Sequence, residues 1–395
     1  MNKKKALIIS FDNLETAPRF FNMFETLKED YEIEVAGYYP NKQLYYTFHN
    51  LLDVEKKNTQ SISFHYNYNF ILKKIISFFI ILSLKIQAIY SSIFFGLPLQ
   101  HFNFFKFLSK KKYDLIVVHH LSPLLLGIKL KEKSKCKLIL NAHEYYPLEF
   151  DADEAWVKIE KPNIDKFCEI NLPKVDLIIS VSTMIVEMFQ QNYNVKTFLF
   201  PNAKANSTIN PSNVDETKIK IISHGVAIKK RKIEEMIEIV NYLPSNYYMD
   251  FMLMPVDKVY YNELLKFSSE RIKFIDVVPM SEIISKINEY DIGLYYIDED
   301  NFNHKYCLPN KFFEFIQAKL CIAISPNPEM KSIVEHYKIG IVSEDYDIKS
   351  FADKIKELRP EKIRMYKEQT IKAANELSLE NFKEKLVEEI RLLVS

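Results

Sequence analysis

The chain contains little glycine, little arginine and few cysteines. Only six of its 395 residues are glycine, and only six of its 53 basic residues are arginine. Its four cysteines form no Cys-x-x-Cys pair, and their spacing fits neither a zinc site nor a dense disulfide framework. We therefore expect reduced thiols in the cytosol. Because the sequence has so few glycines and arginines, each one that is present is a stronger candidate for a specific structural or functional role.

Several sequence signatures of nucleotide-binding and hydrolytic enzymes are absent. No Gly-x-Gly-x-x-Gly follows the expected strands at residues 6–10 and 219–223, and no Gly-x-x-x-x-Gly-Lys-Ser/Thr occurs anywhere. The Gly-x-Ser-x-Gly elbow and the His-Glu-x-x-His motif are missing as well. These absences argue against dinucleotide oxidoreductases and P-loop enzymes.

Charge and apolar runs set further limits. The 53 Lys and Arg residues against 52 Asp and Glu residues give a net charge of +1, so no overall positive field attracts nucleic acid. The strongly apolar segment 70–107 holds Lys85 in the middle of the only window long enough to span a bilayer, which disfavours a spanning helix. A buried helix pair and a basic, apolar helix at a membrane surface remain open alternatives.

The start of the chain is basic, but the apolar run that follows is too short for a signal peptide. We expect a cytoplasmic protein, and peripheral membrane contact would place it at the inner face of the plasma membrane.

What is present is an alternation of short apolar runs with amphipathic stretches, which is typical of βαβ units in parallel sheets. The expected strands of a first sheet are residues 6–10, 33–38, 114–119, 137–141, 176–181 and 196–200. Those of a second sheet are residues 219–223, 248–254, 272–277, 292–297, 321–325 and 339–342. Helices are expected at residues 18–27, 233–243, 281–290, 310–318 and 330–337. The fold class is therefore α/β.

The same pattern suggests a domain division. We expect an N-terminal Rossmann-like domain at 1–205, a linker rich in Asn, Ser, Pro and Thr at 206–217, and a C-terminal Rossmann-like domain at 218–359. The charged, helical residues 360–395 are free to pack against either domain, including a return to the N-terminal one.

Polar residues follow several expected strands at their carboxyl ends, where open α/β sheets bind ligands. In the first half these residues are Asp12, Arg19, His119, His120, Asn141, His143 and Glu144. In the second half they are Ser223, His224, Gly225, Arg231, Asn310, Lys311 and Glu314. We expect both groups to face one crevice between the two sheets. For His119 and His120, polar lining of a strand end is the simpler alternative, and a zinc site is disfavoured.

The stretch SHGVAIKKRKIEE has the features of a diphosphate site. Gly225 ends a strand and lets the backbone approach a ligand, and four basic residues, 229–232, then lead into a helix N-terminus. A solvated basic loop is the alternative interpretation.

The stretch LPNKFFEFIQAKLCIAIS places Glu314 in the first or second turn of a helix that begins at Pro309. A carboxylate there can accept hydrogen bonds from two vicinal hydroxyls, as on ribose, while the amides of Asn310 and Lys311 face phosphate. Helix capping and complementation of the helix dipole are the alternative.

These two stretches, together with DNLETAPRFFNMFETL and NAHEYYPLEF, resemble motifs of the retaining glycosyltransferases of family 4. The resemblance covers most of the chain. It implies the GT-B architecture, in which two Rossmann-like domains face an interdomain cleft. It also implies that Glu314 binds the ribose of a nucleotide-sugar donor, that Arg231 contacts the donor pyrophosphate, and that His143 lies close to the transferred sugar.

The sequence departs from the family pattern at three places. Tyr306 stands where the first acid of an E-x7-E pair is usual, Val226 replaces an arginine that follows the glycine, and residues 10–18 contain no glycine. These departures keep two alternatives open. One is a catalytically degenerate GT-B-like protein that binds a glycan or nucleotide, and the other is a sugar-nucleotide epimerase on the same fold.

The resemblance thus implies a hexosyltransferase-type, retaining enzyme that needs no metal or other cofactor. It would move a sugar from a nucleotide-diphosphate donor to a saccharide or lipid-linked acceptor in cell-surface polysaccharide or lipopolysaccharide biosynthesis, with peripheral membrane contact through residues 70–107. The expected catalytic residues are His143, Arg231 and Lys311. The expected donor-binding residues are His224, Gly225, Lys232, Asn310 and Glu314. The expected acceptor-side residues are Arg19, His119, His120 and Glu144.

Overall fold

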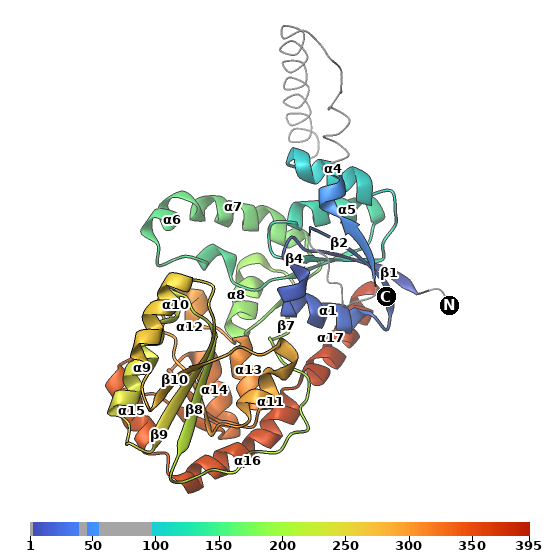
Figure 1. Ribbon diagram of the computed structural model, residues 1–395. Helices are drawn as coiled ribbons and strands as arrows, with labels where there is room; N and C mark the ends of the chain where they lie inside the picture. Colours follow the sequence, from blue (N-terminus) through green and yellow to red (C-terminus); the bar gives the residue numbers. More distant parts are fainter. Residues whose placement is uncertain (1–2, 39–45, 55–96) are drawn as a thin grey trace, which may run out of the picture.

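The structure is a computed structural model that describes residues 3–38, 46–54 and 97–395. These residues form two parallel β-sheets, each flanked by helices (Figure 1). Every strand and helix expected from the sequence is present, with bounds that differ by a few residues. The expected α/β fold class is confirmed.

The first sheet has seven strands in the order β3-β2-β1-β4-β5-β6-β7. Their bounds are β1 Lys4–Ile9, β2 Tyr31–Gly37, β3 Thr47–Asn50, β4 Leu115–His119, β5 Lys137–Asn141, β6 Leu177–Ser180 and β7 Thr197–Leu199. The central strands are continuous apolar runs because helices cover both faces of the sheet, and residues 6–9 are fully buried. Strand β3 was not expected from the sequence, because it is an edge strand whose side chains are only partly buried.

Helices cover both faces of this sheet. Their bounds are α1 Pro18–Leu27, α4 Leu99–Leu108, α5 Leu124–Ser134, α6 Glu154–Ile159, α7 Lys161–Asn171 and α8 Thr183–Tyr193. Helix α1 begins with Pro18, whose fixed φ suits a first helical position, and it buries Phe20, Met23 and Leu27 against the sheet. Its N-terminus is thereby held at the carboxyl end of β1.

The second sheet has six strands in the order β10-β9-β8-β11-β12-β13. Their bounds are β8 Ile219–Val226, β9 Tyr247–Met254, β10 Ile272–Ile275, β11 Ile292–Tyr295, β12 Cys321–Ile324 and β13 Gly340–Val342. One face packs on α9 Ile233–Tyr242, α10 Lys258–Leu264 and α15 Ile348–Lys356. The other packs on α11 Ile283–Ile287, α13 Asn310–Gln317 and α14 Pro328–Tyr337.

The last two helices contact different sheets. Helix α16, Pro360–Glu376, packs against the second sheet, where Ala373 and Ala374 join its core. Helix α17, Leu379–Val394, crosses to the first sheet and packs on α1 through Leu386 and Ile390 (Figure 1). The chain therefore connects the two halves twice, once through residues 202–217 and once between α16 and α17.

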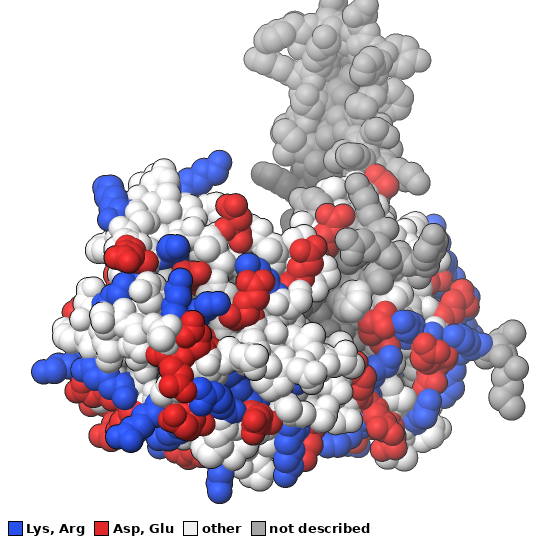
Figure 2. Space-filling view, turned by 60° about the horizontal axis from the view of Figure 1, so that its bottom comes forward, with Lys and Arg blue, Asp and Glu red and all other residues white. Residues whose placement is uncertain are grey.

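Most of the segment 70–107, namely residues 70–96, lies outside the described residues. The expected membrane-surface helix falls in this part. The remaining part contains α4, whose Phe104 and Leu108 are buried in the first core. Within the described ranges, no helix combines the length and apolar character needed to cross a bilayer. On the face shown in Figure 2, acidic and basic side chains are interspersed, in keeping with the balanced net charge.

Candidate functional site

A cavity of about 710 Å³ lies between the two sheets. Its walls are formed by residues that follow the carboxyl ends of β1, β4, β5 and β6 on one side and of β8, β9, β10 and β11 on the other. This is the position at which open parallel sheets bind ligands. The cavity is large enough for a nucleotide-sized molecule.

Most of the expected site residues line this cavity. They are Asp12, Arg19, His120, His143, Glu144, His224, Gly225, Arg231, Asn310, Lys311 and Glu314. Four expected residues do not line it. Asn141 and Ser223 are buried within β5 and β8. His119 is buried beneath His143, with its Nδ1 3.3 Å from the Asn141 amide nitrogen. Lys232 turns instead toward an acidic loop, where its ammonium pairs with Asp298 and Asp300.

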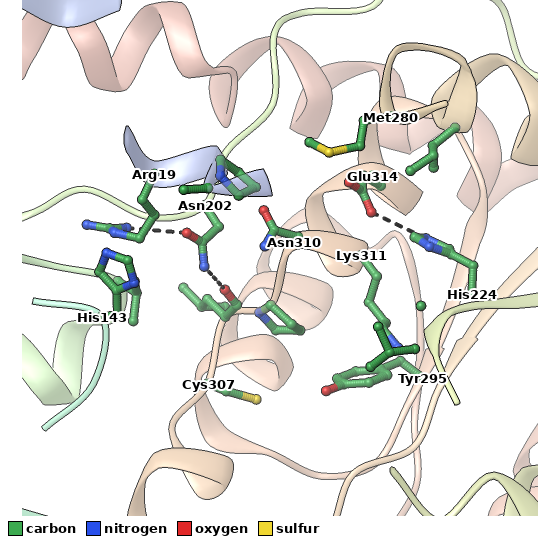
Figure 3. Close-up of a pocket in the computed structure, with 18 of the residues that line it drawn as sticks. Arg19, His143, Asn202, His224, Met280, Tyr295, Cys307, Asn310, Lys311 and Glu314 are labelled. Carbon is green, nitrogen blue, oxygen red and sulfur yellow. Dashed lines mark hydrogen bonds and ion pairs between the residues drawn. The ribbon is translucent and has the colours of Figure 1, made fainter. Parts of the chain in front are cut away.

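Helix α13 positions the acidic group of the second half. Glu314 is only 8% exposed, and its two carboxylate oxygens face different partners. Oε1 lies 2.9 Å from the Lys204 ammonium, and Oε2 lies 3.4 Å from His224 Nε2 without hydrogen-bond geometry (Figure 3). Burial is the largest influence and by itself would raise the pKa of Glu314, but Lys204, His224 and Lys311 together hold the pKa below its usual range. The carboxylate is therefore ionised at neutral pH.

The His224 ring closes this part of the wall. Burial lowers the pKa of His224 to about 4, so the ring is uncharged near pH 7 despite its acidic neighbour Glu314. It packs edge-on against Phe315 at 5.3 Å between ring centroids.

Two cations lie beside the Tyr295 side chain at the end of β11. Arg231, from the short helix η5 Lys229–Arg231, donates to the Tyr295 hydroxyl at 3.1 Å, and Lys311 Nζ lies 4.6 Å from the ring centroid. Burial lowers the pKa of Lys311 to about 7, and the nearby Arg231 adds to this shift. Gly225 is required at this point, because its φ is +138° and a Cβ there would lie 3.0 Å from Lys311 Nζ. Two cations held close together form a site for a polyanion.

Arg19 joins the first half to the loop before α13. Its guanidinium donates to Asn141 Oδ1 at 3.0 Å, to the Phe200 carbonyl at 2.8 Å and to Asn202 Oδ1 at 3.3 Å. Asn202 in turn donates to the Leu308 carbonyl at 3.1 Å (Figure 3). Burial lowers the pKa of Arg19 to about 9, which still leaves it charged at neutral pH. Arg19 is therefore part of a fixed network as well as part of the cavity wall.

His143 faces the second half from the opposite wall. Its Nε2 atom is buried and has no hydrogen-bond partner among the described residues. The ring lies 3.8 Å from the His120 ring between centroids, and His120 Nε2 lies 3.4 Å from Asp12 Oδ2. Burial lowers the pKa of His143 well below its usual value, so the imidazole is neutral near pH 7. Burial also raises the pKa of the adjacent Glu144.

Among the lining residues that sequence reasoning missed, Lys204 and Tyr295 contact the charged groups of the site. Lys204 lies just before the expected linker, in a stretch without periodicity, and Tyr295 ends an apolar strand and looked like a core residue. No motif marks either residue. Among the residues that the structure describes, no group of three or more His, Cys, Asp or Glu side chains is placed to hold a metal ion.

No protein-family profile matches the sequence, and comparison with curated proteins finds no significant match. The fold, in contrast, matches solved structures along its whole length. The structure of Anabaena HepE in complex with UDP and glucose is 10% identical, with a TM-score of 0.68 over 98% of this chain and 99% of that one. Sucrose-phosphate synthase from Thermosynechococcus elongatus is 12% identical, with a TM-score of 0.69 over 99% of both chains. A glycosyltransferase from Rickettsia africae ESF-5 is 11% identical, with a TM-score of 0.66 over 100% of both chains. These likenesses, with the two parallel sheets and the cavity between them, show that the chain has the GT-B fold expected from its motifs.

Proposed function

We propose that the protein is a glycosyltransferase of the family 4 type, which transfers a sugar from a nucleoside-diphosphate donor to an acceptor hydroxyl with retention of configuration. The observation that carries this proposal is the content of the cavity: an ionised, buried Glu314 and two cations, Arg231 and Lys311, on one wall, opposite a neutral His143. The HepE structures with UDP and with UDP-glucose, which share the fold, support a uridine nucleotide as the first donor to test.

The second half would bind the donor. Glu314 would accept hydrogen bonds from the two ribose hydroxyls, while Arg231 and Lys311 would neutralise the diphosphate together with the N-terminal amides of α13 at Asn310. In the reaction, the bond between the anomeric carbon and the diphosphate oxygen breaks with its electron pair, and a bond to the acceptor oxygen forms. The acceptor proton passes to the departing diphosphate. The two cations stabilise the charge that develops there.

The first half would bind the acceptor. His143 would lie near the transferred sugar, and His120, Glu144 and Arg19 would line the acceptor side of the same cavity. We propose a saccharide or lipid-linked acceptor in cell-surface glycan biosynthesis, a cytoplasmic location at the inner face of the membrane, and peripheral membrane contact through residues 70–107.

No metal is required in this scheme, because the two cations supply the positive charge that the leaving group needs.

The test is to incubate the protein with UDP-, GDP- and dTDP-sugars and to measure released nucleotide and released sugar. We expect slow release of both without an acceptor for one donor, and loss of release in the Arg231→Ala variant. Binding without release would indicate a protein that has lost catalysis, and a changed sugar still attached to nucleotide would indicate an epimerase. For the membrane contact, flotation with anionic liposomes at low and high salt is decisive, since a protein that stays soluble at both contradicts it.

A further inference from the structure

The segment that follows β7, residues 202–207, lies against α13, the helix that carries Glu314. Lys204 reaches Glu314 Oε1 at 2.9 Å, and the Ser207 amide donates to Gln317 Oε1 at 2.8 Å, one turn further along the helix. Lys319 Nζ, just after the helix, donates to the Ser207 carbonyl at 3.2 Å. This segment is therefore a wall of the cavity and not a free tether between the two halves.

Within this segment, Lys204 is held on both sides. The preceding Ala203 is fully buried in the core of the second half, and the Lys204 carbonyl accepts a hydrogen bond at 2.8 Å from the amide of Leu379, the first residue of α17. Its side chain is 17% exposed and lies in the cavity wall. Since backbone and neighbour are both fixed, the ammonium has a defined position beside Glu314.

The ion pair with Lys204 leaves one carboxylate oxygen of Glu314 able to accept further hydrogen bonds. A carboxylate offers about four lone-pair directions on its two oxygens, and Lys204 takes one of them on Oε1. Oε2 makes no hydrogen bond to the described residues, because His224 is its neighbour without suitable geometry. Oε2 is thus free to accept from a ligand while the carboxylate stays paired.

We propose that Lys204 is a positioning residue for the nucleotide: it keeps Glu314 ionised and oriented, so that the second carboxylate oxygen is available to the ribose hydroxyls. This inference rests on the proposed function. The physical reason is that a buried carboxylate without a counter-charge takes up a proton instead of bearing the cost of desolvation. A protonated Glu314 would accept hydrogen bonds less strongly, and its hydroxyl would compete for the same partners.

The charged and titratable groups that face Glu314 are Lys204, His224 and Lys311. His224 is neutral throughout the neutral range, because burial lowers its pKa to about 4. Lys311 titrates near pH 7 and changes UDP binding in its own right. The effect of Lys204 is therefore read as the ratio of variant to wild-type affinity at each pH, in which the contribution of Lys311 largely cancels.

The experiment measures UDP affinity by calorimetry from about pH 6 to about pH 8 in the wild type, Lys204→Met, Lys204→Gln and Lys204→Arg. We expect Lys204→Met and Lys204→Gln to bind UDP roughly tenfold more weakly than the wild type at the acidic end, with the difference shrinking as pH rises and Glu314 ionises again. Lys204→Arg retains the charge and should bind UDP as the wild type does.

Lys319→Met is the matched control. It removes a buried lysine that joins the same segment to the same helix but does not touch Glu314. It should leave the pH dependence of UDP binding unchanged. If Lys204→Met and Lys204→Gln show the wild-type affinity at every pH, or lose affinity equally at every pH, the positioning role is wrong while the proposed function stands. If the wild type binds none of the nucleotides tested, the proposed function fails, and this role fails with it.

Discussion

Arg231 donates a hydrogen bond from Nη1 to the Tyr295 hydroxyl at 3.1 Å. The face of the same ring supports Lys311, so one tyrosine at the end of β11 aligns cations from η5 and from α13. Burial and the charge of Arg231 together lower the pKa of Lys311 to about 7. An anion bound between the two cations would relieve this repulsion, which is why we regard the pair as the diphosphate site.

Replacement of Arg231 by alanine is expected to lower turnover more than donor affinity. The leaving diphosphate gains charge as the glycosidic bond breaks, so the lost cation matters most in the transition state. We expect kcat to fall by about 100-fold, the effect typical of removing one preorganised donor, with a smaller change in the KM for the donor. Steady-state kinetics against donor concentration gives both numbers.

The matched control for Arg231 is Lys230→Ala. Lys230 belongs to the same basic stretch but does not line the cavity, and its ammonium lies 5.7 Å from the Phe150 ring centroid. It should retain nearly full turnover. A rise in KM with unchanged kcat in Arg231→Ala would contradict the assigned role.

UDP affinity is expected to fall as pH rises above about 7, the pKa to which burial lowers Lys311. Below this pH Lys311 is charged in the free protein and binds the diphosphate without a change of protonation. Above it, binding must first add a proton to Lys311, so affinity decreases by up to about tenfold per pH unit. Calorimetry between about pH 7 and pH 9 tests this, and heats in buffers of different ionisation enthalpy should show proton uptake.

The variant Lys311→Arg separates this effect from other titrations. An arginine keeps its charge across the whole range, so the decrease above pH 7 should disappear. A wild-type affinity that is constant up to pH 9 would mean that Lys311 does not contact the anion.

Gly225→Ala is expected to reduce both stability and UDP affinity. Its φ of +138° is one that residues with a Cβ rarely adopt, and the new methyl would lie 3.0 Å from Lys311 Nζ. Because the Lys311 side chain can move, most of the cost is backbone strain, about 1–3 kcal/mol. A thermal melt should show a lower Tm. In the double variant with Lys311→Ala the Tm decrease should persist, since the backbone strain remains; full recovery would show that the contact, not φ, is responsible.

The sequence indicates the sheets well because their signal is local. The run at residues 6–9 is apolar throughout, as a strand covered on both faces must be, and its burial in β1 follows from that. Strand β3, Thr47–Asn50, carries no such signal. It forms because its backbone pairs with β2, and this tertiary contact leaves no pattern in four mixed residues.

The sequence predicted which residues gather at the site, but not how their side chains are oriented or paired. The four adjacent basic residues at 229–232 look equivalent in the sequence. The structure separates them, because Lys232 adopts a left-handed conformation and pairs with Asp298, while Arg231 lines the cavity. Lys204 could not be assigned for a similar reason, since its contact with Glu314 joins residues that are far apart in the chain.

Replacement of His143 is expected to separate nucleotide binding from transfer. His143 lies on the wall opposite Glu314, and its Nε2 atom is buried and without a partner among the described residues. In the proposed arrangement this wall faces the sugar and the acceptor, so we expect His143 not to contact UDP. In His143→Ala the UDP affinity should stay within about twofold of the wild type, since no hydrogen bond to the nucleotide is removed. Transfer and donor hydrolysis should fall by about 100-fold or more, the lower range for loss of a positioned polar group near the reacting atoms.

Calorimetry with UDP and rate measurements with the donor sugar, made on one protein preparation, provide the two readouts for His143→Ala. His119→Gln is the control. The His119 ring centroid lies 5.9 Å from that of His143, but His119 is buried and does not line the cavity. Since burial keeps the pKa of His143 well below its usual value, the wild-type rate should show no titration of this group between about pH 6 and pH 8. Full activity in His143→Ala would assign the residue to packing against His120, and a loss of UDP binding would move it to the donor side.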